Sequence, residues 1–180
     1  MERKKVCYNK GKDNKIAFVF SCPGQEEFKN NKVVFGKTGD NLDIFIQELS
    51  LKNIIVSKKY EDRYDFRITN SHNQVYFKGY LNKQTQPNNK EINSENNLLR
   101  LFNELSDIED LIIVFGQKAK YALSCLEKNG YSLKARVHYV RHLGLQSLNQ
   151  IKLEKEVSKD QRTMQRIKII VEDLSEKIKQ

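Results

Sequence analysis

The sequence predicts an α/β domain of the three-layer α/β/α sandwich type, built on a short central parallel sheet. Two runs of five apolar residues, Ile16–Phe20 and Leu111–Phe115, are typical of strands that are covered on both faces. Segments with apolar residues at helical spacing alternate with the strand-like runs, which indicates a parallel sheet with helices on both faces. The 180 residues suffice for one hydrophobic core and contain no clear linker, so we expect a single domain over residues 1–180.

Two shorter strands are expected at residues 65–70 and 137–141, where the sequence reads DFRITN and VHYVR. Four stripes of apolar residues predict amphipathic helices, namely Leu42, Phe45, Ile46 and Leu49; Leu98, Phe102 and Leu105; Ala119, Ala122, Leu123 and Leu126; and Met164, Ile167, Val171, Leu174 and Ile178. The last stripe predicts a long C-terminal helix over about residues 153–179.

Local signals place two helix ends and one long irregular segment. Thr38-Gly39-Asp40 offers a start for the first helix, and Asn129-Gly130 is a favourable pair at the end of the third. The polar stretch 71–93 lacks either periodicity, which is compatible with a disordered insert, but loops of this length in compact domains are often functional.

The net charge of +9 and the isoelectric point near 9.4 favour a polyanionic partner such as nucleic acid. The alternative is that the lysines merely cover a solvated surface. The three cysteines are too scattered for a disulfide framework or a metal site. Because neither a membrane-spanning run nor a signal-peptide core is present, we expect a cytoplasmic location and no membrane partner.

In folds of this class, ligands bind beyond the carboxyl ends of the strands. Four segments are expected to meet at that edge, namely residues 21–40, 70–73, 116–117 and 142–149. Any chemistry of the protein is therefore expected there.

The segment 21–40 has features of a ligand-binding loop. Pro23-Gly24 predicts a tight turn directly after the first strand, and Gly24 lets the backbone approach a ligand closely. Gly36 and Gly39 flank Lys37-Thr38 just before a helix, where free N–H groups and a cation suit a phosphate. The spacing is not that of a P-loop. The alternative interpretation of the same residues is an ordinary glycine turn followed by a helix cap.

Five motifs in this order resemble the uracil-DNA glycosylase superfamily, and most closely its bacterial and archaeal branch with an iron–sulfur cluster. They are Phe20-Ser21-Cys22-Pro23-Gly24 with Glu26-Glu27, Val33-Val34-Phe35-Gly36-Lys37-Thr38-Gly39, Ile68-Thr69-Asn70, residues 112–119 (IIVFGQKA), and Arg141-His142-Leu143. The resemblance covers roughly residues 15–150 and implies a glycosylase-like fold that binds DNA and flips a base out of the stack.

The resemblance also implies a role for each site residue. Asn70 would read the base edge, since its amide both donates and accepts, and His142 would stabilise the departing base. Glu27 or Glu26 would handle water. The base would also meet Ser21, Cys22, Gly24 and Phe35, and the DNA phosphates would meet Gly36, Lys37, Thr38, Gly39, Gln117 and Arg141. Beyond the resemblance, Lys159, Arg162 and Arg166 are expected to share a face of the C-terminal helix that tracks the DNA backbone.

Three departures from the family pattern bear on the substrate and the cofactor. Ser21 and Cys22 stand where the family places an acid, and Val34 stands where it places a stacking phenylalanine, with Phe35 one position on. The cluster cysteines are missing, so we expect no iron–sulfur cluster, no metal and no other cofactor.

Three functions follow as expectations. The preferred one is a monomeric DNA glycosylase that leaves an abasic site. Its substrate would be uracil, with a role in DNA repair, or a modified base such as a decorated phage cytosine, with a role in defence against phage. The first alternative is a catalytically inactive DNA-binding protein on the same fold. The second is an unrelated nucleotide- or phosphate-binding α/β protein.

Overall fold

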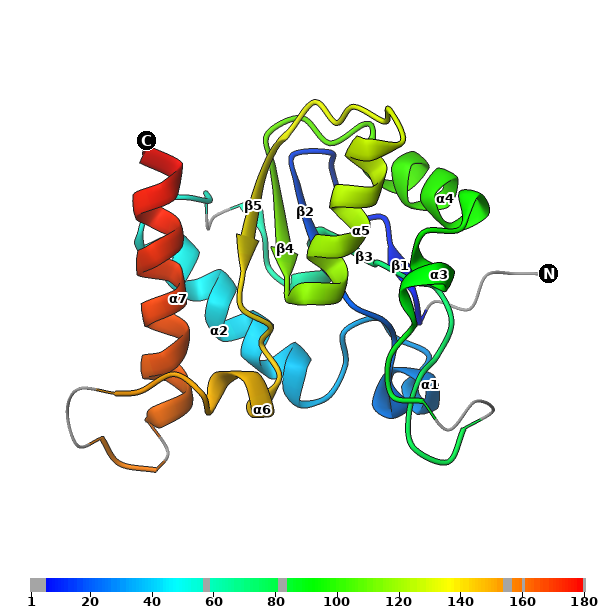
Figure 1. The fold of residues 1–180 in the computed structure, drawn as a ribbon. Helices are drawn as coiled ribbons and strands as arrows, with labels where there is room; N and C mark the ends of the chain where they lie inside the picture. Colours follow the sequence, from blue (N-terminus) through cyan, green and yellow to red (C-terminus); the bar gives the residue numbers. More distant parts are fainter. Residues whose placement is uncertain (1–5, 57–58, 81–83, 154–156, 160, 180) are drawn as a thin grey trace.

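A computed structural model describes residues 6–56, 59–80, 84–153, 157–159 and 161–179. Its centre is a five-stranded sheet in the order β1-β3-β2-β4-β5 (Figure 1). The strands are β1 (Tyr8–Asn9), β2 (Ile16–Phe20), β3 (Arg67–Asn70), β4 (Leu111–Phe115) and β5 (Arg136–Val140). Strands β2 to β5 run parallel, and the short β1 pairs antiparallel with β3. The predicted α/β class with a largely parallel sheet is confirmed.

Helices cover both faces of the sheet (Figure 1). Helices α2 (Lys37–Leu51) and α7 (Arg162–Lys179) pack on one face, and α4 (Glu95–Leu105) and α5 (Gln117–Lys128) pack on the other. The remaining described helices are short: α1 (Gln25–Asn30), α3 (Asn89–Ile92), α6 (Leu145–Leu148) and the 3₁₀ helix η2 (Arg63–Asp65). No helix in the described part of the chain is long and apolar enough to cross a membrane.

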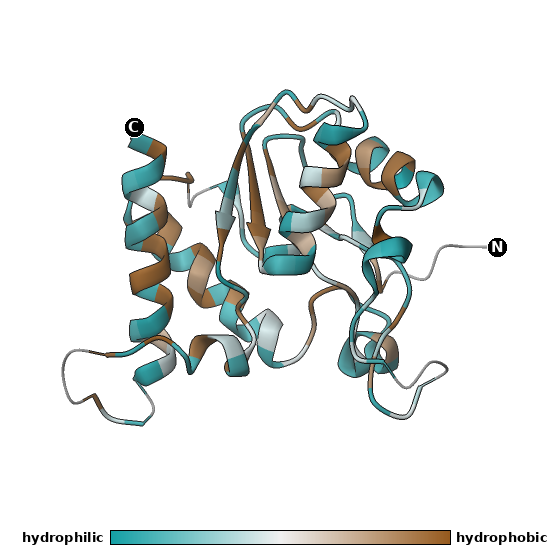
Figure 2. Ribbon diagram, viewed as in Figure 1, coloured by the Kyte–Doolittle hydropathy of each residue, from teal (hydrophilic) through white to brown (hydrophobic). Residues whose placement is uncertain are grey.

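Alternate residues of each strand belong to two different hydrophobic cores. In β2, Phe18 and Phe20 face the core under α2 and α7, whereas Ala17 and Val19 face the core under α4 and α5. All five residues of β2 are buried, which explains why this strand reads as a continuous apolar run. Figure 2 shows the same arrangement: the central strands are coloured brown, for hydrophobic residues, and the helices on either side turn brown faces toward them.

The predicted strands agree closely with the observed ones. The bounds of β2 and β4 are as predicted, β3 begins two residues later than expected, and β5 is shifted by one residue. Most residues of the four helical stripes are buried, but Met164 remains 42% exposed because it lies near the open first turn of α7.

Three local predictions about helices were wrong. Helix α2 begins at Lys37 with Gly36 as its N-cap, not at Thr38-Gly39-Asp40, and the supposed loop 21–40 contains α1. Helix α7 begins at Arg162 and not near residue 153.

The late start of α7 has a physical cause. The Arg166 side chain donates hydrogen bonds to the backbone oxygen of Ile151 (3.2 Å) and to Oδ1 of Asn149 (2.5 Å). The chain therefore folds back before the helix begins. Lys159 lies outside the helix and cannot share a helical face with Arg162 and Arg166, so that prediction was also wrong.

Candidate functional site

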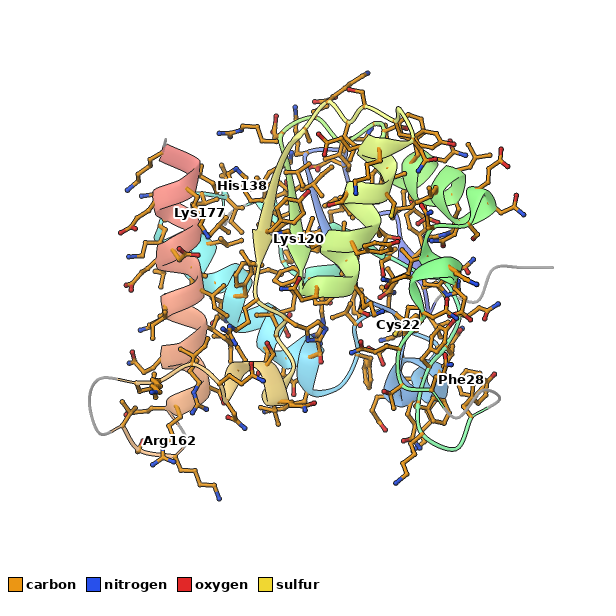
Figure 3. All side chains as sticks on the ribbon, in the orientation of Figure 1. Cys22, Phe28, Lys120, His138, Arg162 and Lys177 are labelled. Atoms are coloured by element: carbon orange, nitrogen blue, oxygen red, sulfur yellow. The ribbon has the colours of Figure 1, made fainter. Side chains whose placement is uncertain are left out.

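A cavity of about 220 Å³ lies at the carboxyl edge of the parallel strands. Its lining comes from the end of β2, the turn into α1, the start of α2, the end of β3, the segment after β5, and the irregular stretch after β3. The lining residues are Phe20, Ser21, Cys22, Gly24, Glu27, Val34, Thr38, Asn70, Tyr76, Thr85, Gln86 and His142. Cys22 lies in this region, between α1 and the end of the sheet (Figure 3).

Aromatic and aliphatic side chains form the apolar wall of the cavity. Phe20 stacks on Phe115, with ring centroids 4.4 Å apart, and His142 meets the Phe20 ring edge-on at 6.0 Å. Val34, held at a φ of 46°, lines the cavity, whereas Phe35 does not. The Phe35 ring instead lies 6.0 Å from Nζ of Lys32. The structure thus places the smaller Val34, and not Phe35, beside any ligand.

Asn70 ends β3 and lies opposite Phe20 in the parallel ladder of β2 and β3. Its side chain is 2% exposed, and Nδ2 donates to the backbone oxygen of Cys7 at 3.2 Å. The Asn70 side chain also lines the cavity. The amide is therefore held in place at the wall of the cavity, and an amide of this kind can both donate and accept hydrogen bonds.

A buried polar network supports the backbone around Asn70. Nη2 of Arg100 donates to the backbone oxygens of Asn70 (2.9 Å) and Ser71 (3.3 Å), and Nδ2 of Asn97 donates to Ser71 O (2.8 Å). Arg100 also pairs with Glu104 at 2.6 Å, and both side chains are 6% exposed. Because these groups are buried, displacing any of them is costly, and the network rigidly positions the strand end.

His142 enters the site with one ring nitrogen already occupied. Its Nδ1 accepts a hydrogen bond from the backbone N–H of Gly144 at 2.9 Å. The neutral ring must therefore carry its proton on Nε2, which becomes a donor. Burial lowers the pKa of His142 below its usual value of 6.5, so the neutral form prevails at neutral pH.

The two predicted acids differ in their surroundings. Glu27 lines the cavity, and its Oε2 accepts a hydrogen bond from Gly24 N at 3.0 Å, which caps α1. Burial raises the pKa of Glu27. Glu26 is exposed, pairs with Lys29 at 3.6 Å and packs against Gly36, outside the cavity. Only Glu27 is placed to act on a ligand in the cavity.

Ser21 and Cys22 line the cavity without supplying a carboxylate. Burial raises the pKa of Cys22 to about 11. The side chain is therefore a thiol at neutral pH and not a nucleophilic thiolate. The Ser21 hydroxyl points to Cys22 Sγ at 3.8 Å, and its backbone oxygen accepts from Ser71 Oγ at 2.6 Å.

The structure separates four of the six residues proposed for phosphate binding, those in segment 36–39. Thr38 lines the cavity, and Gly36 and the exposed Lys37 lie at the start of α2. Gly39 is buried inside α2, where an added Cβ would collide with Arg63 and with the backbone oxygen of Val34. Gly39 is thus a packing position that cannot reach a phosphate.

A basic groove of about 650 Å³ adjoins the cavity and shares Ser21, Gln86 and His142 with it. Its lining includes the predicted residues Gln117 and Arg141, together with Lys118, Lys120, Lys177 and Asp173. Lys120 lies over the ring of Tyr139 at 5.4 Å. Lys120 of α5 and Lys177 of α7 lie on either side of β5 (Figure 3).

Sequence reasoning missed Tyr76, Thr85 and Gln86, which close one side of the cavity. The one available signal was the length of the polar stretch 71–93, to which all three belong. A larger hollow of about 730 Å³ runs along α2 and η2 and involves none of the predicted site residues. We regard the smaller cavity as the functional one, because it unites residues from six separate segments at the ligand-binding edge of the sheet.

Within the described residues, no group of three or more His, Cys, Asp or Glu side chains is arranged to hold a metal ion. No protein-family model matches the chain, and no curated protein matches it. The assignment of a function therefore rests on the geometry of the site.

Proposed function

We propose that this protein is a DNA glycosylase of the uracil-DNA glycosylase type, which flips a base from DNA and hydrolyses its N-glycosidic bond. The observation that carries the proposal is the cavity itself, in which Glu27, Asn70 and His142 meet although they lie far apart in the sequence. Its volume of about 220 Å³ is below the range usual for whole drug-sized ligands, which suits a single base.

The base would be held by one polar and one aromatic contact. The Asn70 amide is fixed by Cys7 and by the network around Arg100, so it can read a pyrimidine edge without first losing conformational freedom. Phe20, backed by Phe115, offers an aromatic surface in the same cavity. These contacts compensate for the unstacking that base flipping requires.

The chemical step would divide between His142 and Glu27. When the glycosidic bond breaks, its electron pair leaves with the base, and Nε2–H of neutral His142 stabilises the charge that develops there. Water attacks the sugar carbon on the opposite side, and Glu27 accepts the proton that the water gives up. The products are a free base and an abasic site.

The basic groove would hold the DNA backbone next to the flipped nucleotide. It opens from the cavity at Ser21, Gln86 and His142, and its cations Lys118, Lys120 and Arg141 suit phosphates. The small Val34 side chain leaves more room than a phenylalanine would. This supports a modified base as the substrate, such as a decorated phage cytosine, and a defence role.

One observation favours an inactive DNA-binding protein as a second candidate. The Glu27 carboxylate already accepts a hydrogen bond from Gly24 N, and Ser21 and Cys22 supply no other acid. If capping α1 is the sole role of Glu27, the cavity would hold a base without hydrolysing its bond.

The test is to incubate the protein with DNA that carries uracil, hypoxanthine or natural modified cytosines, and then to measure alkali-labile strand breaks. Breaks that disappear in Asn70→Ala and His142→Ala are expected. If DNA binding persists but no substrate gives breaks, the inactive alternative holds. If breaks survive both substitutions unchanged, the site is wrongly assigned.

A further inference from the structure

Tyr76 brings a buried phenol to the wall of the cavity. Its side chain is 4% exposed, and its hydroxyl oxygen has no hydrogen-bond partner within the part of the chain that the structure describes. A hydroxyl removed from water without a partner is unfavourable. A ligand that supplies the missing partner therefore gains affinity at this point of the cavity.

The position of Tyr76 is set before any ligand enters. Its backbone N–H donates to the oxygen of Pro23 at 2.9 Å, which ties it to the turn that carries Glu27 into the cavity. Its ring meets the ring of His72 at 5.6 Å and 64°. His72 N in turn donates to Ser21 O at 3.2 Å. The phenol is thus part of a preorganised wall and not a freely moving side chain.

The protonation state of Tyr76 makes it a donor. Burial, followed by the nearby negative charge of Glu91, raises the pKa of Tyr76 above its usual value of 10. The Glu91 carboxylate lies beside the hydroxyl and contributes to this shift, but it does not complete a hydrogen bond with it, and it already accepts from Asn88 N at 2.7 Å. The hydroxyl keeps its proton at neutral pH and can offer it to an acceptor in the cavity.

We propose that Tyr76 determines which base the cavity accepts, by donating a hydrogen bond from its buried hydroxyl to an oxygen atom of the base or of its substituent. This inference rests on the proposed function, since it requires that the cavity holds a base. Thr85 and Gln86 from the same segment line the cavity beside Tyr76 and make this wall polar. Such a wall suits an oxygen-bearing base better than one with an apolar group, because a site built around a buried donor discriminates against ligands without an acceptor.

The test compares wild type, Tyr76→Phe and the matched control Tyr131→Phe, whose ring packs on Phe102 and lies outside the cavity. The probes are single-stranded oligonucleotides of one sequence with uracil, cytosine, 5-hydroxymethylcytosine, 5-methylcytosine or a tetrahydrofuran abasic analogue at the centre. Dissociation constants are measured at one salt concentration. Hydroxymethyl- and methylcytosine differ in one hydroxyl oxygen, and uracil carries an oxygen and an N3–H where cytosine carries an amino group and an unprotonated N3.

Wild type and Tyr131→Phe are expected to prefer the oxygen-bearing member of at least one pair by about tenfold, and Tyr76→Phe to lose that preference. All three should bind the abasic analogue equally. The inference is overturned if Tyr76→Phe keeps the preference, or if wild type distinguishes neither pair.

Thermal unfolding without DNA separates a ligand-binding role from a structural one. Because the hydroxyl has no hydrogen-bond partner among the residues that the structure describes, Tyr76→Phe should unfold at the wild-type Tm or above it. A Tm several degrees lower would mean that the hydroxyl stabilises the fold, and would overturn the inference.

Strand breaks measured on the same samples distinguish the proposed role of Tyr76 from the proposed glycosylase activity. A Tyr76-dependent preference without breaks refutes only hydrolysis, whereas breaks with unchanged selectivity in Tyr76→Phe refute only the role of Tyr76.

Discussion

The backbone N–H of Gly144 donates to Nδ1 of His142 at 2.9 Å and so determines which nitrogen of the imidazole carries the proton. The ring is also buried, and burial lowers its pKa below 6.5. Both features favour the same species, a neutral imidazole with a proton on Nε2. The cavity therefore contains a neutral donor whose state depends on pH.

The first prediction concerns stability and pH. The folded-state pKa of His142 is lower than the unfolded value of 6.5, so the unfolded chain binds more protons in acid. The stability that the neutral ring contributes is complete above about pH 6.5 and is lost as the pH falls below it. We expect Tm to fall less between about pH 7.5 and pH 5 in His142→Asn than in wild type. His72 and His138, whose pKa values are also lowered by burial, remain in both proteins, so the difference reports on His142. Parallel curves would refute the assignment.

The second prediction uses two glycines with nearly the same φ. Gly116 (φ +84°) lies just before α5, and Gly130 (φ +82°) lies just after it. A Cβ added at Gly116 would lie 3.0 Å from His142 Cβ, whereas a Cβ added at Gly130 would have no atom within 4 Å. Each alanine variant should be destabilised by roughly 1–3 kcal/mol through backbone strain. Gly116→Ala should also lose about tenfold or more of the glycosylase rate, because it displaces the imidazole. Rates of strand-break formation, measured below the Tm of both variants, check this. Equal rates in the two variants would show that the contact with His142 does not matter.

The third prediction separates the neighbouring acids. Glu27→Gln keeps an oxygen for the N–H of Gly24 but removes the charge, so α1 should remain capped while abasic-site formation falls about 100-fold or more. Glu26→Gln, which loses only an exposed ion pair with Lys29, should retain the wild-type rate. Single-turnover rates on the best substrate decide the matter. A Glu27→Gln variant with full activity would leave Glu27 with the helix cap as its only role.

The fourth prediction concerns the basic groove. Lys120→Ala should weaken binding to DNA of any sequence and reduce the slope of log Kd against log salt by about one, because one phosphate contact is lost. Lys134→Ala is the control, since Lys134 precedes β5 and is not among the residues that line the groove. Fluorescence anisotropy over a range of salt concentrations measures both slopes. If the two variants change the slope equally, the groove is not the path of the backbone.

Much of the scaffold could be predicted because burial on both faces leaves a clear mark in the sequence. Strands β2 and β4 are fully buried and read as continuous apolar runs, so their bounds were predicted correctly. Asn70 and His142 were placed at one edge because parallel strands bring their carboxyl ends together. Position along a strand was sufficient for both residues.

The walls of the cavity could not be predicted in the same way. Whether Val34 or Phe35 faces the cavity depends on a positive φ at Val34, which is unusual for a β-branched residue and leaves no trace in the pattern. Tyr76 reaches the cavity through a hydrogen bond to Pro23, and backbone contacts of irregular segments have no periodicity. The start of α7 was misjudged because the residues before it have a helical composition, whereas Arg166 ties the chain back to Ile151.

The first part of the segment that carries Tyr76, and further on Thr85 and Gln86, is joined to the turn after β2 through main-chain atoms, since Tyr76 N donates to Pro23 O and His72 N to Ser21 O. Bonds between main-chain atoms do not depend on which side chains the segment carries. Over evolutionary time, the residues of this wall can therefore be exchanged while the sheet, Asn70 and His142 stay in place. A lineage under pressure from a changing set of target bases would accumulate its substitutions here first, and a designer who wishes to redirect the protein would randomise the same three positions.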